Sequence, residues 1–183
     1  MKRASFKILT TPRLFLRQLT DSDAASLSAL RSNEKVNLYI DRPAQTSLEE
    51  AKVFIKKINA GIEKGTSWYW VISLKESSAL VGTICLWNFS ADNTMAEVGY
   101  ELDPAFHGQG IMSEALHCIV SFAFQSLHLD TIEAFTHKEN KSSIQLLLKH
   151  NFKLEPDRFD TENKHNIVFS LKRGERPGST SVN

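Results

Sequence analysis

The stretch Leu102-Asp103-Pro104-Ala105-Phe106-His107-Gly108-Gln109-Gly110-Ile111-Met112-Ser113 lies between a strand-like segment and a run of residues with helical periodicity. Gly108 and Gly110 let the backbone turn tightly and approach a ligand without a Cβ in the way. Unpaired amides at the start of the next helix then point at one spot, where the helix dipole also favours an anion. The stretch predicts a loop that binds a pyrophosphate; the alternative is a glycine-containing turn without a ligand.

Two common phosphate loops fit this stretch poorly. A Walker loop ends in Gly-Lys-Ser/Thr, and no such triplet follows Gly110. A dinucleotide fingerprint has glycine or alanine where Ser113 stands, and its acidic residue ends the next strand, whereas Asp130 precedes that strand. The loop is therefore assigned to neither class.

The segments around the loop predict a mixed α/β (α+β) fold. Residues 95–102, 113–127 and 131–136 read as strand, helix and strand, so the two strands should be parallel. Residues 68–74, 80–89 and 95–102 predict an antiparallel meander of three strands, which makes the sheet mixed with helices on both faces. Other expected elements are an edge strand at 13–19, helices at 24–30, 47–65 and 140–150, and strands at 152–154 and 167–171.

Composition narrows the classes of protein further. A chain of 183 residues with 42% hydrophobic and 23% charged residues is typical of a soluble globular domain, which we assign to residues 1–172, with a flexible tail at 173–183. The net charge of +1 argues against a nucleic-acid partner, and no apolar run is long enough for a membrane span. Cys85 and Cys118 are expected to be buried free thiols, no metal site is expected, and without an apolar leader at 1–5 the chain is expected to be cytoplasmic.

Five motifs follow one another along the chain: Thr11–Arg17, Ala96–Leu102, Gly108–Leu116, Asn140-Lys141-Ser142-Ser143 and Lys149-His150-Asn151-Phe152. Their order and spacing resemble the Gcn5-related N-acetyltransferase (GNAT) superfamily, in the branch that contains the ribosomal-protein N-terminal acetyltransferases. The resemblance spans about residues 10–172. Two departures are that His107 and Met112 stand at the ends of the family's loop motif, and that Asn151 replaces a helix-ending glycine. Asparagine tolerates the left-handed conformation that this turn needs.

The resemblance implies the GNAT fold, in which a parallel strand pair splays apart and acetyl-CoA binds in the gap as cosubstrate. The backbone at the end of the strand would pair with the pantetheine chain, and the loop amides would hold the pyrophosphate. The residues implied in cofactor binding are Glu101, Leu102, His107, Gly108, Gln109, Gly110, Ile111, Met112, Ser113, Asn140 and Ser143.

Two residues are candidates for the chemistry of acyl transfer to an amine. Glu97 stands where many family members have a carboxylate that deprotonates the amine; Glu101, on the same face of the strand, competes for that role, and Glu97 can also be an ordinary surface or ion-paired carboxylate. Many relatives place a tyrosine at the position of Leu147, which has no hydrogen to donate. In its place, Ser143 is a candidate donor to the leaving sulfur, or an ordinary helix serine.

The acceptor is expected to be a primary amine, and a protein or peptide N-terminus is our first choice. A small-amine acetyltransferase acting on polyamines or aminoglycosides, and a non-catalytic acyl-CoA sensor, remain alternatives. Specificity is expected in 34–46 and in a late loop at 157–164, and exposed strands near the C-terminus suggest a homodimer. Four acidic residues in or just before the late loop can receive a cationic amine or form a solvated surface: Glu155, Asp157, Asp160 and Glu162.

Overall fold

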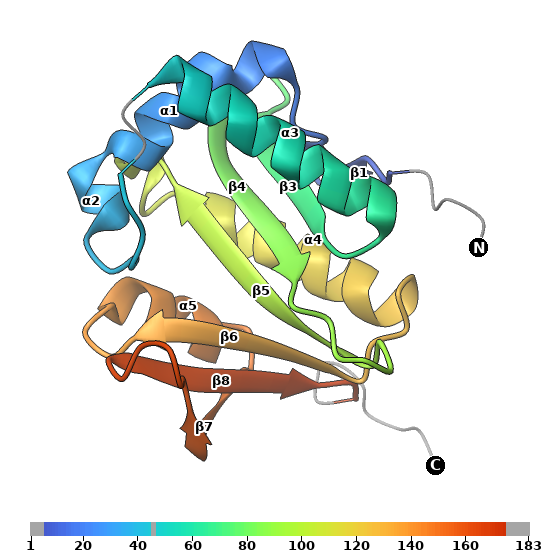
Figure 1. Ribbon diagram of the computed structural model, residues 1–183. Helices are drawn as coiled ribbons and strands as arrows, with labels where there is room; N and C mark the ends of the chain where they lie inside the picture. Colours follow the sequence, from blue (N-terminus) through green and yellow to red (C-terminus); the bar gives the residue numbers. More distant parts are fainter. Residues whose placement is uncertain (1–5, 45–46, 175–183) are drawn as a thin grey trace.

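A computed structural model describes residues 6–44 and 47–174, and the strands of these residues form one mixed sheet of eight strands (Figure 1). The spatial order is β1-β2-β3-β4-β5-β6-β8-β7, and within the described chain β5 and β6 are the one parallel pair. The strands are β1 (Leu9–Thr10), β2 (Leu14–Arg17), β3 (Trp68–Leu74), β4 (Leu80–Trp87), β5 (Met95–Leu102), β6 (Thr131–His137), β7 (Lys153–Phe159) and β8 (Asn166–Lys172).

The helices begin and end where the local sequence supplies caps. The Ser47 side chain accepts a hydrogen bond from the Glu50 amide at the start of α3, and Gly65 ends that helix with a φ of 72°. The Asn140 side chain caps α5 by accepting from the Ser143 amide, and Asn151 adopts the left-handed conformation after it. The helices are α1 (Ala24–Ser32), α2 (Glu34–Asn37), α3 (Leu48–Lys64), α4 (Ile111–Gln125) and α5 (Lys141–Lys149).

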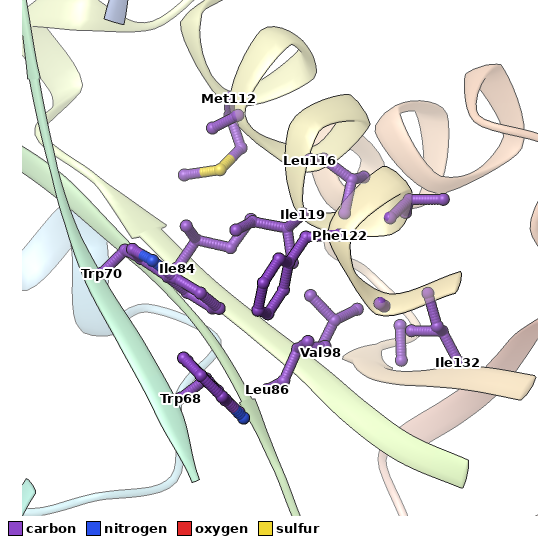
Figure 2. Packing of buried hydrophobic residues seen from close by; sticks show 14 of the residues in the cluster. Trp68, Trp70, Ile84, Leu86, Val98, Met112, Leu116, Ile119, Phe122 and Ile132 are labelled. Carbon is purple, nitrogen blue, oxygen red and sulfur yellow. The ribbon is translucent and has the colours of Figure 1, made fainter. Parts of the chain in front are cut away.

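Helices cover both faces of the sheet, and each face has its own hydrophobic core. On one face α4 buries its apolar side, and the rings of Trp68 and Trp70 lie 5.1 and 5.4 Å from the Phe122 ring (Figure 2). On the other face α1 and α3 pack on β3 and β4 around Leu27, Ile55 and other buried residues (Figure 1). Strand β3 is buried on both faces, which explains its almost continuous run of apolar residues.

The parallel pair β5–β6 is short, and this shortness creates the gap in the sheet. Pairing runs over three residue pairs and ends at Glu97↔Glu133. Beyond Glu97, β5 continues to pair with β4 as far as Leu102↔Gly82, while β6 stays paired with β8 and diverges from β5 (Figure 1). The β6-facing edge of residues 98–102 therefore has no strand partner within the described residues.

The predicted mixed fold, the meander and the parallel pair are confirmed, but several boundaries were wrong. The strand expected at the sheet edge is interior, because the two-residue β1 pairs outside it. Strand β7 runs to Phe159, so it includes part of the expected late loop. Helix α4 starts at residue 111, two residues early, and the short α2 was not predicted.

The structure also bears on the expectations for the two cysteines and for the C-terminal tail. Cys85 and Cys118 are free thiols but are half-buried instead of buried. Arg173, expected in a flexible tail, donates from Nε to the Leu129 carbonyl and pairs with Asp130; residues 175–183 lie outside the described residues. No helix within 6–44 and 47–174 combines the length and the apolar character needed to cross a bilayer.

Candidate active site

The loop between β5 and α4 is built to expose backbone amides. Asp103 caps a short turn at Pro104–Phe106 by accepting from the Ala105 amide. Gly108 and Gly110 then adopt φ values of 72° and 74°, which side chains rarely allow, and α4 begins at the next residue. The first amides of a helix have no acceptor within the helix, so those of residues 111–113 are available to an anion.

Side chains of the loop hold its own backbone in place. The His107 Nε2 atom hydrogen-bonds the Leu102 carbonyl at 3.0 Å, and Gln109 Nε2 donates to the Ala105 carbonyl at 3.0 Å. Arg13 reaches the loop from the N-terminal segment, donating to the Gln109 carbonyl at 2.9 Å while pairing with Glu114 at 2.6 Å. The side chains of Arg13, His107 and Gln109 therefore hold the backbone of the loop in place.

A cavity of about 600 Å³ fills the gap between β5 and β6 and continues to this loop. It brings together ten of the eleven predicted cofactor-binding residues, all except Gln109. Glu97 does not line it. The predicted residues that line the cavity are Glu101, Leu102, His107, Gly108, Gly110, Ile111, Met112, Ser113, Asn140 and Ser143.

Ser143 lies in the first turn of α5, and its hydroxyl is 2.8 Å from the hydroxyl of Tyr100 on β5. Burial raises the pKa of Tyr100 to about 12, against a smaller lowering by the Ser143 hydrogen bond. Leu147 is fully buried in the core. Sequence reasoning missed Tyr100, although the alternation along β5 places it with Ala96 and Val98 on the α4 face.

Glu97 lies at the last residue pair before β5 and β6 diverge, opposite Glu133. Burial raises the pKa of Glu97 to about 7; a 3.5 Å hydrogen bond from Asn88 opposes this, and the negative charges of Asp160, Glu133 and Glu162 add to it. A carboxylate with a pKa near neutrality can take a proton from an amine and release it again.

Glu101 has the opposite environment, although it lies on the same face of the same strand. Its carboxylate accepts from Arg31 at 3.3 Å, from Arg42, and from the Thr83 hydroxyl at 3.3 Å. Its side chain is 7% exposed. Two guanidinium groups and a hydroxyl therefore contact this carboxylate, and they tie β5 to α1 and to the segment after α2.

One side of the cavity is formed by α2 and the residues that follow it. Lys35, Tyr39 and Ile40 line this side, all within the segment expected to set specificity. The Tyr39 ring lies 5.2 Å from the His137 ring, which in turn stacks on His165 at 5.5 Å. The segment after α1 is thus linked to the β7–β8 turn across the sheet.

The four late acidic residues do not form one cluster. Asp157 is exposed on β7, and Glu155 on the same strand accepts from the Ser170 hydroxyl. Asp160 receives a hydrogen bond from Asn166 at 2.8 Å, and its charge together with that of Glu162 acts on Glu97.

Comparisons with known proteins agree with this geometry. Residues 13–153 match the model of the acetyltransferase (GNAT) domain family. YoaA of Bacillus subtilis, an N-acetyltransferase whose activity is uncharacterized, is 35% identical over 150 residues, covering 82% of this chain and 85% of that protein. The ribosomal-protein-serine acetyltransferase of Escherichia coli is 36% identical over 76 residues, 42% of each chain.

Solved structures extend the likeness to most of the chain. A Vibrio cholerae protein assigned to the ribosomal-protein-serine acetyltransferases superposes with a TM-score of 0.78 at 27% identity, covering 91% of this chain and 98% of that one. Mycobacterium smegmatis RimJ, solved with a CoA disulfide, has the same fold at 21% identity, with a TM-score of 0.76 over 90% of this chain and 84% of that one. The matched domain model and the similarity to YoaA over most of both chains show that this chain belongs to the GNAT family and is an N-acetyltransferase.

Proposed function

We propose that this chain transfers an acetyl group from acetyl-CoA to a primary amine, and that the acceptor is a protein or peptide N-terminus. The observation that carries the proposal is the cavity that joins the amides of the α4 loop to the Ser143 hydroxyl through the gap between β5 and β6. Glu97 lies at the point where this gap begins.

The residues present fit a coenzyme A molecule. A chain with a pyrophosphate needs an anion site, which the amides of the glycine loop supply, and partners for its amide groups, which the unpartnered backbone edge of residues 98–102 supplies. Apolar side chains such as Val98 and Leu146 line the cavity between them. A second hollow of about 660 Å³ adjoins Gly110 and Ser113, and its lining includes Arg13, which is paired with Glu114, and Lys149, whose ammonium group is available to a phosphate. Acetyl-CoA supplies the acetyl group as an activated thioester.

The chain's own side chains supply proton handling. Glu97 takes a proton from the acceptor amine, directly or through water, since its raised pKa suits this exchange near pH 7. Ser143 donates a hydrogen bond to the sulfur as the thiolate leaves. The carboxylates of Glu133, Asp160 and Glu162 make the surroundings of Glu97 negative and so attract a cationic amine.

Support for an N-terminal amine comes from the relatives. The Escherichia coli and Vibrio cholerae proteins are ribosomal-protein-serine acetyltransferases by name, and the latter aligns with 91% of this chain. We assign the acceptor to the side of the cavity bordered by α2 and Tyr39. This segment is separate from the α4 loop, to which we assign the cofactor.

Two measurements test the proposal. Calorimetry with CoA and acetyl-CoA should give saturable binding, and absence of binding at millimolar ligand would end it. CoA release should then be followed with peptides that begin with serine or alanine, with spermidine and with an aminoglycoside. Turnover on peptides supports the proposal, turnover on spermidine or the aminoglycoside alone changes the acceptor class, and binding without any turnover identifies an acyl-CoA sensor.

Replacing Ser143 tests its role in that reaction. Ser143→Ala should lower kcat by about 100-fold and leave acetyl-CoA affinity nearly unchanged, because the lost hydrogen bond forms mainly as charge develops on sulfur. Gln145→Ala, an exposed position on the same helix, is the control. Full kcat in Ser143→Ala, with chemistry shown to limit the rate, would make Ser143 an ordinary helix residue.

A further inference from the structure

The hydroxyl groups of Tyr100 and Ser143 meet across the cavity from two different elements. Tyr100 comes from β5, Ser143 from α5, and the oxygen atoms are 2.8 Å apart. Both residues line the cavity. Among the described residues, Tyr100 is the one hydrogen-bond partner of Ser143 Oγ. The backbone amide of Ser143 makes a separate hydrogen bond, to Asn140 Oδ1 at 3.1 Å.

The direction of this hydrogen bond decides what Ser143 can do. A serine hydroxyl carries one hydrogen and two lone pairs, so it can donate to one atom only. If Ser143 donated to Tyr100, it would have no hydrogen left for a sulfur atom. If Tyr100 donates to Ser143, the serine hydrogen is free to point into the cavity.

We propose that Tyr100 is a positioning residue that donates its hydrogen bond to Ser143 Oγ and thereby directs the Ser143 hydrogen toward the sulfur of coenzyme A. This inference rests on the proposed function and assigns a role to a residue on the opposite wall of the cavity. No proton leaves Tyr100 in this scheme. Ser143 donates one hydrogen bond, and Tyr100 fixes its direction and strengthens it, since hydrogen bonds in a chain polarise one another.

The surroundings of Tyr100 suit this role. Its ring packs against the main core, so the hydroxyl is held in place from β5. A phenol is a stronger donor than an aliphatic hydroxyl, and with a pKa raised to about 12 it keeps its hydrogen at every physiological pH. Leu147 is buried in the core and supplies no hydroxyl, so within the described residues β5 provides the tyrosine that α5 lacks.

The first test measures binding without turnover. Calorimetry compares CoA with desulfo-CoA between pH 7 and 9, and the desulfo-CoA series removes the contributions of other groups in the cavity, such as Lys35 and His107. A hydrogen bond to sulfur stabilises the thiolate, so CoA should bind more tightly as pH rises. In the wild-type protein, the ratio of the affinity for CoA to the affinity for desulfo-CoA should rise at least tenfold between pH 7 and 9. Tyr100→Phe should lose most of this gain, as should Ser143→Ala.

Tyr69→Phe is the matched control, since Tyr69 is a buried tyrosine in the core on the other face of the sheet. It should keep the wild-type gain in CoA affinity. An unchanged gain in Tyr100→Phe, or no gain in the wild-type protein, would overturn the inference. Neither outcome touches the proposed acetyl transfer, which CoA release tests separately.

The second test is a double-mutant cycle on turnover. Tyr100→Phe alone should lower kcat about tenfold with KM for acetyl-CoA within twofold of wild type, the size expected for one oriented hydrogen bond. In a Ser143→Ala background the same change should alter kcat by less than twofold, because the serine that it orients is gone. Additive losses would show that Tyr100 acts independently of Ser143 and would overturn the inference.

Discussion

The two ends of strand β5 carry glutamates on the same face, and the protein treats them in opposite ways. At one end Glu101 is enclosed by Arg31, Arg42 and Thr83. At the other end Glu97 is half-buried, receives one long hydrogen bond from Asn88 and faces other carboxylates. Both side chains lie on the same face of the strand, so the partners contributed by other segments distinguish the ion-paired Glu101 from Glu97, the candidate base.

The largest effect expected at the Glu101 end is on stability. Glu101→Gln should lower the free energy of unfolding by about 3 kcal/mol, because it leaves two largely buried guanidinium groups without a countercharge. Urea denaturation at pH 7 measures the change, and Glu49→Gln, which breaks an exposed pair with Lys52, is the control. If Glu101→Gln is as stable as wild type, the contrast between the two ends of β5 fails.

At the Glu97 end the largest effect expected is on rate. Glu97→Gln should lower kcat/KM by about 100-fold at pH 8 and remove the acidic limb of the pH–rate profile, which should have its midpoint near pH 7 in the wild-type protein. Glu133→Gln is the informative control: it should keep that limb and move it to lower pH, because one charge that raises the pKa of Glu97 is gone. An acidic limb that persists in Glu97→Gln would assign the base elsewhere.

Replacing Glu97 should raise the stability of the protein, whereas replacing Glu101 should lower it. Its pKa is near 4.5 when unfolded and about 7 when folded, so the folded state favours the protonated carboxyl and loses stability as pH rises through 7. Glu97→Gln should therefore be more stable than wild type by about 1–2 kcal/mol at pH 8, after allowing for solvent screening, and equal to it near pH 4. Thermal melts across this range measure the difference; a Glu97→Gln protein that is less stable at pH 8 would contradict the pKa.

The smallest effect expected lies at the α4 loop, outside both ends of the strand. Gly110→Ala should weaken acetyl-CoA binding about fivefold, since a Cβ there lies 3.4 Å from Arg13 Nη2 and the φ of 74° strains any side chain. Gly65→Ala carries the same kind of strain at the end of α3, where a Cβ meets open space. Both should cost about 1 kcal/mol of stability, and only the first should change affinity in calorimetry.

The sequence was most informative where a structure depends on neighbouring residues. The α4 loop could be predicted from two glycines directly before a helix. The caps by Ser47 and Asn140 could be predicted because each side chain accepts from an amide three residues further on. Strand β7 was underestimated because Pro156 and its charged neighbours are typical of a loop and are tolerated only at a sheet edge.

Contacts between distant residues were out of reach. Tyr100 and Ser143 are 43 residues apart, and Glu101 is separated from Arg31 by 70 residues. Hydrophobic periodicity indicates which face a side chain takes, but it does not say which side chain of another element it meets. The contacts that distinguish Glu97 from Glu101 are of this kind, so the sequence left both as candidates for the base.

The short parallel pairing between β5 and β6 has a mechanical consequence. Only three residue pairs, which we call the seam, join the two parts of the sheet within the described residues. One part, or plate, contains β1 to β5, and the other contains β6, β8 and β7. Below the seam α4 holds the plates together, because one hydrophobic cluster runs from Trp70 through Ile119 to Phe169. Because strand pairing between the plates is limited to this seam, we expect a molecule bound along residues 98–102 to add contacts between them, so that amide exchange in β6 and β8 slows in proportion to its occupancy.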